Sequence, residues 1–189
     1  DATANYNEDC TLYTVIPDSN FEDRLIALEI DKDGKNGKVK TESILKVTSL
    51  DLQSSNISDL TGVEDFKALL YLDCKYNVIT TINVTQNKLL RGLDLYDNKV
   101  SSLDVTANTE LLSLTFGKNK ISSIDLSKNT KLINLSADDN LLSSIDFSNN
   151  TDLRNIYCGR NNLTTLSVSN LPHLTQLNCI FTNISEIDV

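Results

Sequence analysis

Apolar residues recur along this chain with a step of 21 residues from Leu72 onward. Further apolar columns lie two, seven, ten and twelve positions after each member of this series. A period between about 20 and 50 residues is typical of repeat proteins, whose units bury their apolar faces against each other. The pattern therefore predicts a solenoid. The series itself consists of Leu50, Leu72, Leu93, Leu114, Leu135, Ile156 and Leu177.

Each unit opens with an alternating apolar pattern, which predicts a short strand with two inward side chains. The later apolar positions bring the chain back around a coil, so that successive strands stack in parallel about 4.8 Å apart. We predict an α/β-type solenoid of about seven right-handed coils, with a parallel sheet on the concave face. Apart from a short N-terminal helical cap, little helix is expected.

A column of asparagines keeps the same step where each predicted strand ends. An asparagine side chain can donate to and accept from the inward peptide groups of a turn, and losing such a partner costs roughly 1–3 kcal/mol. We interpret the column as a structural ladder, formed by Asn77, Asn98, Asn119, Asn140 and Asn161. A second ladder is expected at the opposite turn, formed by Asn87, Asn108, Asn129 and Asn150.

The pattern divides the chain into three parts. Residues 1–15 are expected to be an N-terminal extension, residues 16–46 a cap made of a helix and an acidic glycine-rich loop, and residues 47–189 the repeats. Ser19 and Glu22 fit a capping box at the start of the helix. The repeats stop at Val189 without a polar terminal cap, and open solenoid ends expose core. We therefore expect further domains, or a covering partner, in the full-length protein.

The loop after the helix is similar to a calcium loop of the EF-hand type. Lys35 is inserted relative to that pattern, and Ser43 stands where the bidentate acid is expected. Two interpretations stay open. The first is a glycine-rich, hairpin-like loop with solvated charges. The second is a weak calcium site, the one cofactor considered for this chain, with ligands from Asp31, Asp33, Asn36 and Glu42.

Charge and cysteine usage narrow the classes of partner. The formal net charge is −9 and the pI is about 4.5, which argues against nucleic acid and anionic membranes as partners. No apolar run approaches the roughly 18 residues that span a bilayer. Three of the four cysteines fall in one inward column, where free cysteine behaves as a small hydrophobe. Disulfides are not expected between Cys74, Cys158 and Cys179, and Cys10 has no evident partner.

The units YLDCKYNVITTINVTQNKLL and GLDLYDNKVSSLDVTANTELL look like bacterial leucine-rich repeats. They resemble the cysteine-containing repeats of surface and secreted proteins of Bacteroidetes, and the N-terminal region is more loosely similar to that of internalins. This resemblance implies a secreted or cell-surface protein, associated with the outer membrane. The absence of methionine agrees with a mature or trimmed fragment of such a protein.

Function is expected on the strand face, where irregular residues alternate with the core positions. The single histidine, His173, lies in no recognisable catalytic context, so an enzyme is not expected. We predict a non-catalytic module that binds a protein partner at the cell surface, since tyrosines on a rigid ridge are favoured anchors. The alternative is carbohydrate binding or adhesion through the same face. The candidate residues are Tyr71, Asp73, Lys75, Tyr76, Asp94, Tyr96, Tyr157, Arg160 and Phe181.

Overall fold

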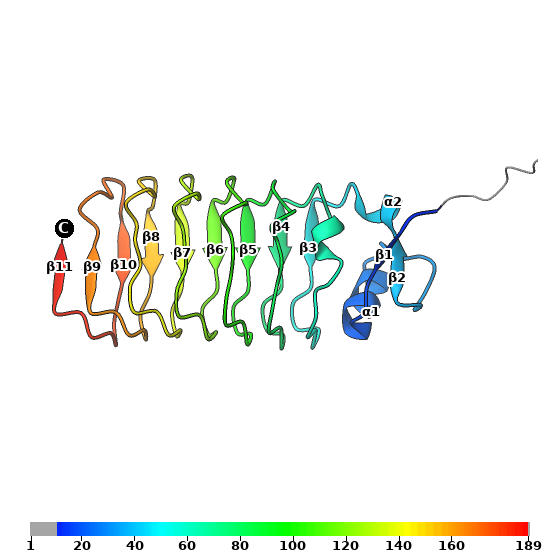
Figure 1. Ribbon diagram of the computed structural model, residues 1–189, viewed down its shortest axis with the longest axis horizontal. Coiled ribbons are helices and arrows are strands. Elements are labelled where there is room, and N and C mark those ends of the chain that lie inside the picture. Colours follow the sequence, from blue (N-terminus) through cyan, green and yellow to red (C-terminus); the bar gives the residue numbers. More distant parts are fainter. Residues whose placement is uncertain (1–10, 189) are drawn as a thin grey trace, which may run out of the picture.

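The computed structural model describes residues 11–188, which wind into one row of coils (Figure 1). The first ten residues, which include Cys10, and Val189 lie outside the described part. The predictions made for them therefore cannot be compared with the structure. Seven parallel strands form one sheet in the order β3-β4-β5-β6-β7-β8-β10. The predicted solenoid with a parallel sheet is therefore confirmed. Its strands are β3 (Ser49–Asp51), β4 (Tyr71–Asp73), β5 (Gly92–Asp94), β6 (Ser113–Thr115), β7 (Asn134–Ser136), β8 (Asn155–Tyr157) and β10 (Gln176–Asn178).

The register of the sheet follows the 21-residue step. Leu50 pairs with Leu72, and Leu72 pairs with Leu93, so the middle residue of each strand faces the core. From β3 to β8 these middle residues are buried, whereas the residues on either side of them point away from the core. In the last coils the return side also forms two short parallel strands, β9 (Thr165–Ser167) and β11 (Glu186–Asp188). The sequence pattern did not predict these two strands.

The cysteines fill the core as expected. Cys74 and Cys158 are buried and free, while Cys179 is free and only partly buried near the open end. Burial raises the pKa of Cys158 to about 12 and raises that of Cys74 well above its usual value. Thiols with such pKa values hold their protons at neutral pH, so they serve packing rather than reactivity.

The asparagines of the ladder at the end of the strands form hydrogen bonds between neighbouring coils. Asn98 is typical: its side-chain nitrogen donates to the carbonyls of Cys74 (3.0 Å) and Leu95 (3.1 Å), and its oxygen accepts from the amide of Ile79 (3.1 Å). Each asparagine thus joins its own coil to the preceding one. Asn119 repeats the arrangement on the next coil.

The backbone adopts one repeated conformation just after the strands, which the sequence pattern did not predict. Each residue immediately before a ladder asparagine, or before Ser55 and Thr182 at the equivalent positions of the end coils, has a positive φ between 51° and 57°. This left-handed conformation is uncommon for residues other than glycine. It turns the side chain out at the end of the strand and sets a regular edge column. Its members are Ser54, Tyr76, Asp97, Lys118, Asp139, Arg160 and Phe181.

The second asparagine ladder lies at the opposite turn and is completely buried. Asn108 donates to the carbonyls of Val84 and Asn87, both at 2.9 Å, and Asn129 donates to those of Val105 and Asn108 in the same way. Both turns of each central coil are therefore tied to the coil before it. Since these bonds link neighbours only, stability is expected to be distributed along the row.

The N-terminal cap is built from β1 (Tyr13–Val15), α1 (Ser19–Ala27), β2 (Lys38–Lys40) and α2 (Thr41–Ile44). β1 pairs antiparallel with β2, so residues 13–15 belong to the cap and not to an extension that ends at residue 15. The cap covers the first coil at one end of the row (Figure 1).

Two contacts fix the cap on that coil. Phe21 of α1 stacks on Phe66, with ring centroids 6.4 Å apart. Gly62 precedes the short 3₁₀ helix η1 (Val63–Asp65), and a Cβ built on it would lie 2.5 Å from the carbonyl oxygen of Val15. Gly62 therefore allows β1 of the cap to lie directly against the first coil. It belongs to the one repeat that is a residue longer than the others.

The predicted capping box is wrong in its residues. Asp18, one position before Ser19, caps α1 and accepts from the amides of Asn20 (2.9 Å) and Phe21 (3.0 Å). Glu22 is buried and accepts instead from the amides of Asn36 and Gly37 in the glycine-rich loop, both at 2.6 Å. Asp18 wins the cap position because its carboxylate also reaches Ser58 in the first coil. Glu22 therefore holds the loop rather than the helix end.

Candidate functional site

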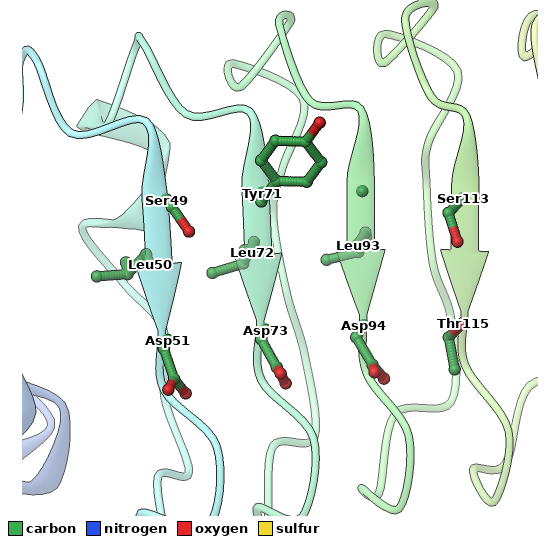
Figure 2. Close-up of a pocket in the computed structure, with 11 residues that line it drawn as sticks. Ser49, Leu50, Asp51, Tyr71, Leu72, Asp73, Leu93, Asp94, Ser113 and Thr115 are labelled. Atoms are coloured by element: carbon green, nitrogen blue, oxygen red, sulfur yellow. The ribbon is translucent and has the colours of Figure 1, made fainter.

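The strand face is defined here as the surface formed by the outward side chains of β3 to β8 and β10, together with the residues that follow each strand. Over β3 to β6 this face carries a groove of about 390 Å³ (Figure 2). Its sides come from the outward residues of neighbouring strands, so its composition is set by the irregular positions of the repeat. The lining side chains include Ser49, Asp51, Tyr71, Asp73, Asp94, Ser113 and Thr115.

Three carboxylates form a row along the groove. Asp51 pairs in register with Asp73, and Asp73 with Asp94, so that the three side chains lie side by side (Figure 2). Arg24 from the cap lies 3.4 Å from Asp51, and Lys75 lies 2.7 Å from Asp73. Asp94 has no ion-pair partner among residues 11–188. The row therefore keeps one unneutralised carboxylate on the strand face.

The two ends of this row differ in electrostatic environment. Burial, together with the neighbouring charge of Asp73, raises the pKa of Asp94, although the amide of Tyr96 and the charge of Lys75 oppose the shift. Burial also acts on Asp51, but hydrogen bonds from Gln53 and the charge of Arg24 outweigh it and lower the pKa overall. The surroundings therefore stabilise the ionised carboxylate of Asp94 less than that of Asp51.

An aromatic ring closes one side of the groove. Tyr71 is 51% exposed and leans from β4 toward β5 above the carboxylate row (Figure 2). It lies over Gly92, because a Cβ added to Gly92 would come within 3.0 Å of the Tyr71 ring. Every other strand of the seven carries a side chain at the position of Gly92. The missing side chain therefore gives the ring its position.

A second aromatic group lies at the edge of the strand face where the strands end. The rings of Tyr76 and Tyr96 meet edge to face with centroids 5.6 Å apart. The ammonium of Lys118 lies 5.1 Å from the centroid of Tyr96 and 3.7 Å from the carboxylate of Asp97. Tyr76 remains 50% exposed. The carboxylate row is therefore flanked by tyrosine on both sides.

The predicted site residues fall into two groups rather than one. The N-terminal patch lies on β4, β5 and the turns that follow them. It consists of Tyr71, Asp73, Lys75, Tyr76, Asp94 and Tyr96. The C-terminal patch lies on β8 and the turns after β8 and β10, and consists of Tyr157, Arg160 and Phe181. Strands β6 and β7 separate the two patches.

The C-terminal patch is held by its own contacts. The Arg160 guanidinium lies 5.1 Å from the centroid of the Phe181 ring, and the Tyr157 hydroxyl donates to the side chain of Gln176. Phe181 and Ile180 are 72% and 58% exposed. Both residues lie in the turn directly after β10, which is the edge strand of the sheet. Exposure here thus accompanies the absence of a following strand in the sheet.

Several residues of the groove were not among the candidates. They are Gly92, Ser113 and Thr115. Gly92 could have been found from the sequence, since a glycine at an outward strand position marks room for a neighbouring side chain. Ser113 and Thr115 give no such signal, because hydroxyl residues occur at many outward positions.

The residues of the predicted calcium site do not come together as a set of ligands. Among residues 11–188, no group of three or more acidic, histidine or cysteine side chains is placed to hold a metal ion. Asp33 pairs with Lys40 at 3.2 Å, and Asp31 accepts from the amide of Asp33. The amide of Asn36 is bound by Glu22, and Glu42 lies in the first turn of α2. Oδ2 of Asp31 is buried without a hydrogen-bond partner among residues 11–188, but a single free carboxylate oxygen does not make a calcium site.

No helix among the described residues is both long and apolar enough to cross a membrane.

No protein-family model matches the chain. A stretch of 72 residues, 38% of this chain, is 38% identical to Internalin J of Listeria monocytogenes serotype 4b and covers 8% of that protein. Among solved structures, the functional domain of InlJ from Listeria monocytogenes, which includes a cysteine ladder, matches 94% of this chain with 31% identity and a TM-score of 0.80. The chain covers 45% of that InlJ structure.

Two further structures have the same fold. The internalin inlF from Listeria monocytogenes is 22% identical over 92% of this chain, with a TM-score of 0.78, and 59% of its own length is covered. A leucine-rich repeat protein of Leptospira interrogans is 26% identical over 78% of this chain, with a TM-score of 0.73, and 44% of its length is covered. The chain has the leucine-rich repeat fold of the internalins, and it spans less than two thirds of the length of each of these relatives.

Proposed function

We propose that this leucine-rich repeat chain is the non-catalytic binding module of a secreted or cell-surface bacterial protein. In this proposal it recognises a protein partner through the strand face. The internalin-like fold itself indicates a protein-binding module. The proposal adds that the module lies at the cell surface and that its partner binds the strand face.

One observation supports the strand face most directly. The regular positions of the repeat form the core and the two ladders, whereas the carboxylate row and the half-exposed Tyr71 and Tyr76 lie on the strand face. Tyr71 and Tyr76 remain half exposed there although their coil has neighbours on both sides. Exposed tyrosines on a rigid scaffold contribute large contact area at a small loss of conformational freedom.

The two patches contribute unequally to the proposed contact with the partner. The N-terminal patch provides the principal contact, because it combines a groove, a carboxylate row and three tyrosines. The C-terminal patch provides a second contact around Arg160 and Phe181. A partner that spans both patches would cross β6 and β7, whose outward residues are small and polar.

Site-specific photo-cross-linking tests the proposal. A benzoylphenylalanine is placed at Tyr71 on the strand face or at Ser123, an exposed residue of the return side in the same column as Thr165 of β9. Each protein is exposed to an extract of cell-surface proteins, irradiated and examined by mass spectrometry. We expect one discrete adduct from position 71 and none from position 123. Equal adducts from both positions would contradict a strand-face site.

A glycan array separates the main alternative. If the chain binds one family of glycans and Tyr71→Ala abolishes that binding, the module recognises carbohydrate rather than protein. Tyr71→Ala leaves the core untouched, because Tyr71 points away from it.

A further inference from the structure

The groove over β3 to β6 has a chemistry that defines one kind of occupant. It contains carboxylates, hydroxyls and one tyrosine ring, and the residues that line it include no cation. Ionised carboxylates attract cationic groups, and an aromatic ring attracts a cation placed over its face. A groove with both elements is complementary to a positively charged group.

Each carboxylate of the row accepts from the backbone amide two residues further on, but this bond alone does not account for three adjacent negative charges. Like charges placed directly opposite each other on neighbouring strands are destabilising, and Asp51, Asp73 and Asp94 occupy such positions. Arg24 and Lys75 offset the charges of Asp51 and Asp73, whereas Asp94 is left without a cation. The next strand carries Thr115 at this position, so the repeat itself does not require an acid there.

The ring of Tyr71 stands in the right place to complete a cation site. Gly92 lets it lean over the groove from β4 toward β5, and both Tyr71 and Asp94 line the groove (Figure 2). The carboxylate of Asp94 already accepts from the amide of Tyr96 at 2.9 Å through one oxygen, which leaves its other oxygen free for a ligand. A flat cation could therefore rest against the ring while it donates to the carboxylates.

We propose that this groove binds a basic side chain, arginine in preference to lysine, presented by an extended segment of a protein partner. Arginine is preferred because its planar guanidinium can stack on Tyr71 and donate to more than one carboxylate, whereas an ammonium acts as a point charge. The formal net charge of −9 adds a general attraction for a basic partner and raises the rate of encounter. Because the groove lies within the strand face, this role depends on the function proposed above.

The test is an NMR titration of the ¹⁵N-labelled chain with blocked tripeptides. The three peptides are acetyl-Gly-Arg-Gly-amide, acetyl-Gly-Lys-Gly-amide and acetyl-Gly-citrulline-Gly-amide, and citrulline is the neutral analogue of arginine. We expect the arginine peptide to shift the amides of Asp73, Asp94 and Thr115 with millimolar affinity. The citrulline peptide should bind at least about fivefold more weakly, because a charge-assisted hydrogen bond is roughly twice as strong as a neutral one.

A matched pair of variants assigns the effect to the groove. Asp94→Asn removes the unneutralised carboxylate, and Asp152→Asn removes one exposed negative charge outside the groove, so both change the net charge equally. We expect Asp94→Asn to weaken the arginine peptide about fivefold and Asp152→Asn to have no measurable effect, since screened charges act over only about 10 Å. Equal weakening by both variants, or equal binding of arginine and citrulline, overturns the proposal.

The outcomes also distinguish this site from the wider function. If position 71 cross-links a protein but the arginine peptide leaves the groove amides unchanged, the cation site fails and the protein-binding face stands. If the peptide binds in the groove and no protein is cross-linked, the proposed protein partner fails, and only the affinity of the groove for a basic group stands. Glucosamine serves as a further arm: if it binds the groove more tightly than the arginine peptide, the basic protein side chain is the wrong occupant.

Discussion

The two patches of the strand face expose aromatic residues for different physical reasons. Tyr71 and Tyr76 belong to the coil of β4, which has a strand of the sheet on either side. The N-terminal cap covers the coil before it. Phe181 lies beyond β10, where Leu174, Leu177, Cys179 and Ile184 are only partly buried. Exposure therefore marks a surface between neighbouring coils in the first case and a partly buried core beside the last strand of the sheet in the second. Exposure alone does not identify a binding residue in a solenoid; its position relative to the neighbouring coils does.

The largest contrast is expected in folding stability. Asn98→Ala removes bonds to two coils and leaves the buried amide of Ile79 without a partner, so it should lower the free energy of unfolding by about 3 kcal/mol. Thr182→Ala removes one bond to the Cys179 carbonyl at the open end and should cost about 1 kcal/mol or less. Urea denaturation of the two variants measures the difference. Equal losses would show that the end coil is as tightly held as the centre.

A smaller contrast is expected in binding. Tyr71→Ala should weaken the partner identified by cross-linking about tenfold, because it removes the ring that closes the groove. Phe181→Ala should change the affinity by about twofold or less, since its contacts belong to the second patch. Isothermal titration calorimetry with both variants gives the ranking. The reverse ranking would make the open end the principal contact.

The sequence predicted the regular parts of this molecule well and the irregular parts only in fragments. The core columns, both asparagine ladders and the parallel sheet follow from the 21-residue step, because each is repeated in nearly every coil. The edge column of positive φ was missed, since its members share a backbone conformation and no side-chain type. The division of the site into two patches was missed as well. It depends on which coil each irregular residue occupies.

The cap illustrates the same limit. Ser19 and Glu22 fit a local motif, but Asp18 caps α1 because it also binds the first coil, more than 35 residues away in sequence. Glu22 is drawn to the amides of the glycine-rich loop. Contacts between distant segments decided both outcomes, and no local pattern records them.

A still smaller effect is expected for the pH dependence of stability. The pKa of Asp94 is raised in the folded chain, so the folded state holds this proton more readily than the unfolded state does. Ionisation of Asp94 therefore costs stability above its pKa, and the cost disappears as the pH falls below it. Asp94→Asn should be slightly more stable than the parent at pH 7 and equal to it near about pH 3. Thermal unfolding at the two pH values checks the sign, and a variant less stable at pH 7 contradicts it.

The smallest effect is expected from calcium. Lys40 pairs with Asp33, and Glu22 accepts from the loop amides, so these groups are already bound within the chain, whereas Oδ2 of Asp31 is buried without a partner among the described residues. Addition of calcium to about 5 mM should leave the melting temperature unchanged, because a ligand raises it only by binding the folded state. An increase that EDTA reverses, and that Asp31→Asn abolishes, would restore the calcium site predicted from the sequence.

A cross-linking scan along one column of the sheet tests whether binding is concentrated at the capped end of the strand face. Benzoylphenylalanine replaces, one at a time, the first residue of six strands: Ser49, Tyr71, Ser113, Asn134, Asn155 and Gln176. The yield of the partner adduct is measured for each position by quantitative mass spectrometry. We predict a maximum at positions 49 and 71 and a decline toward position 176. A flat profile, or a maximum at position 176, would contradict the account.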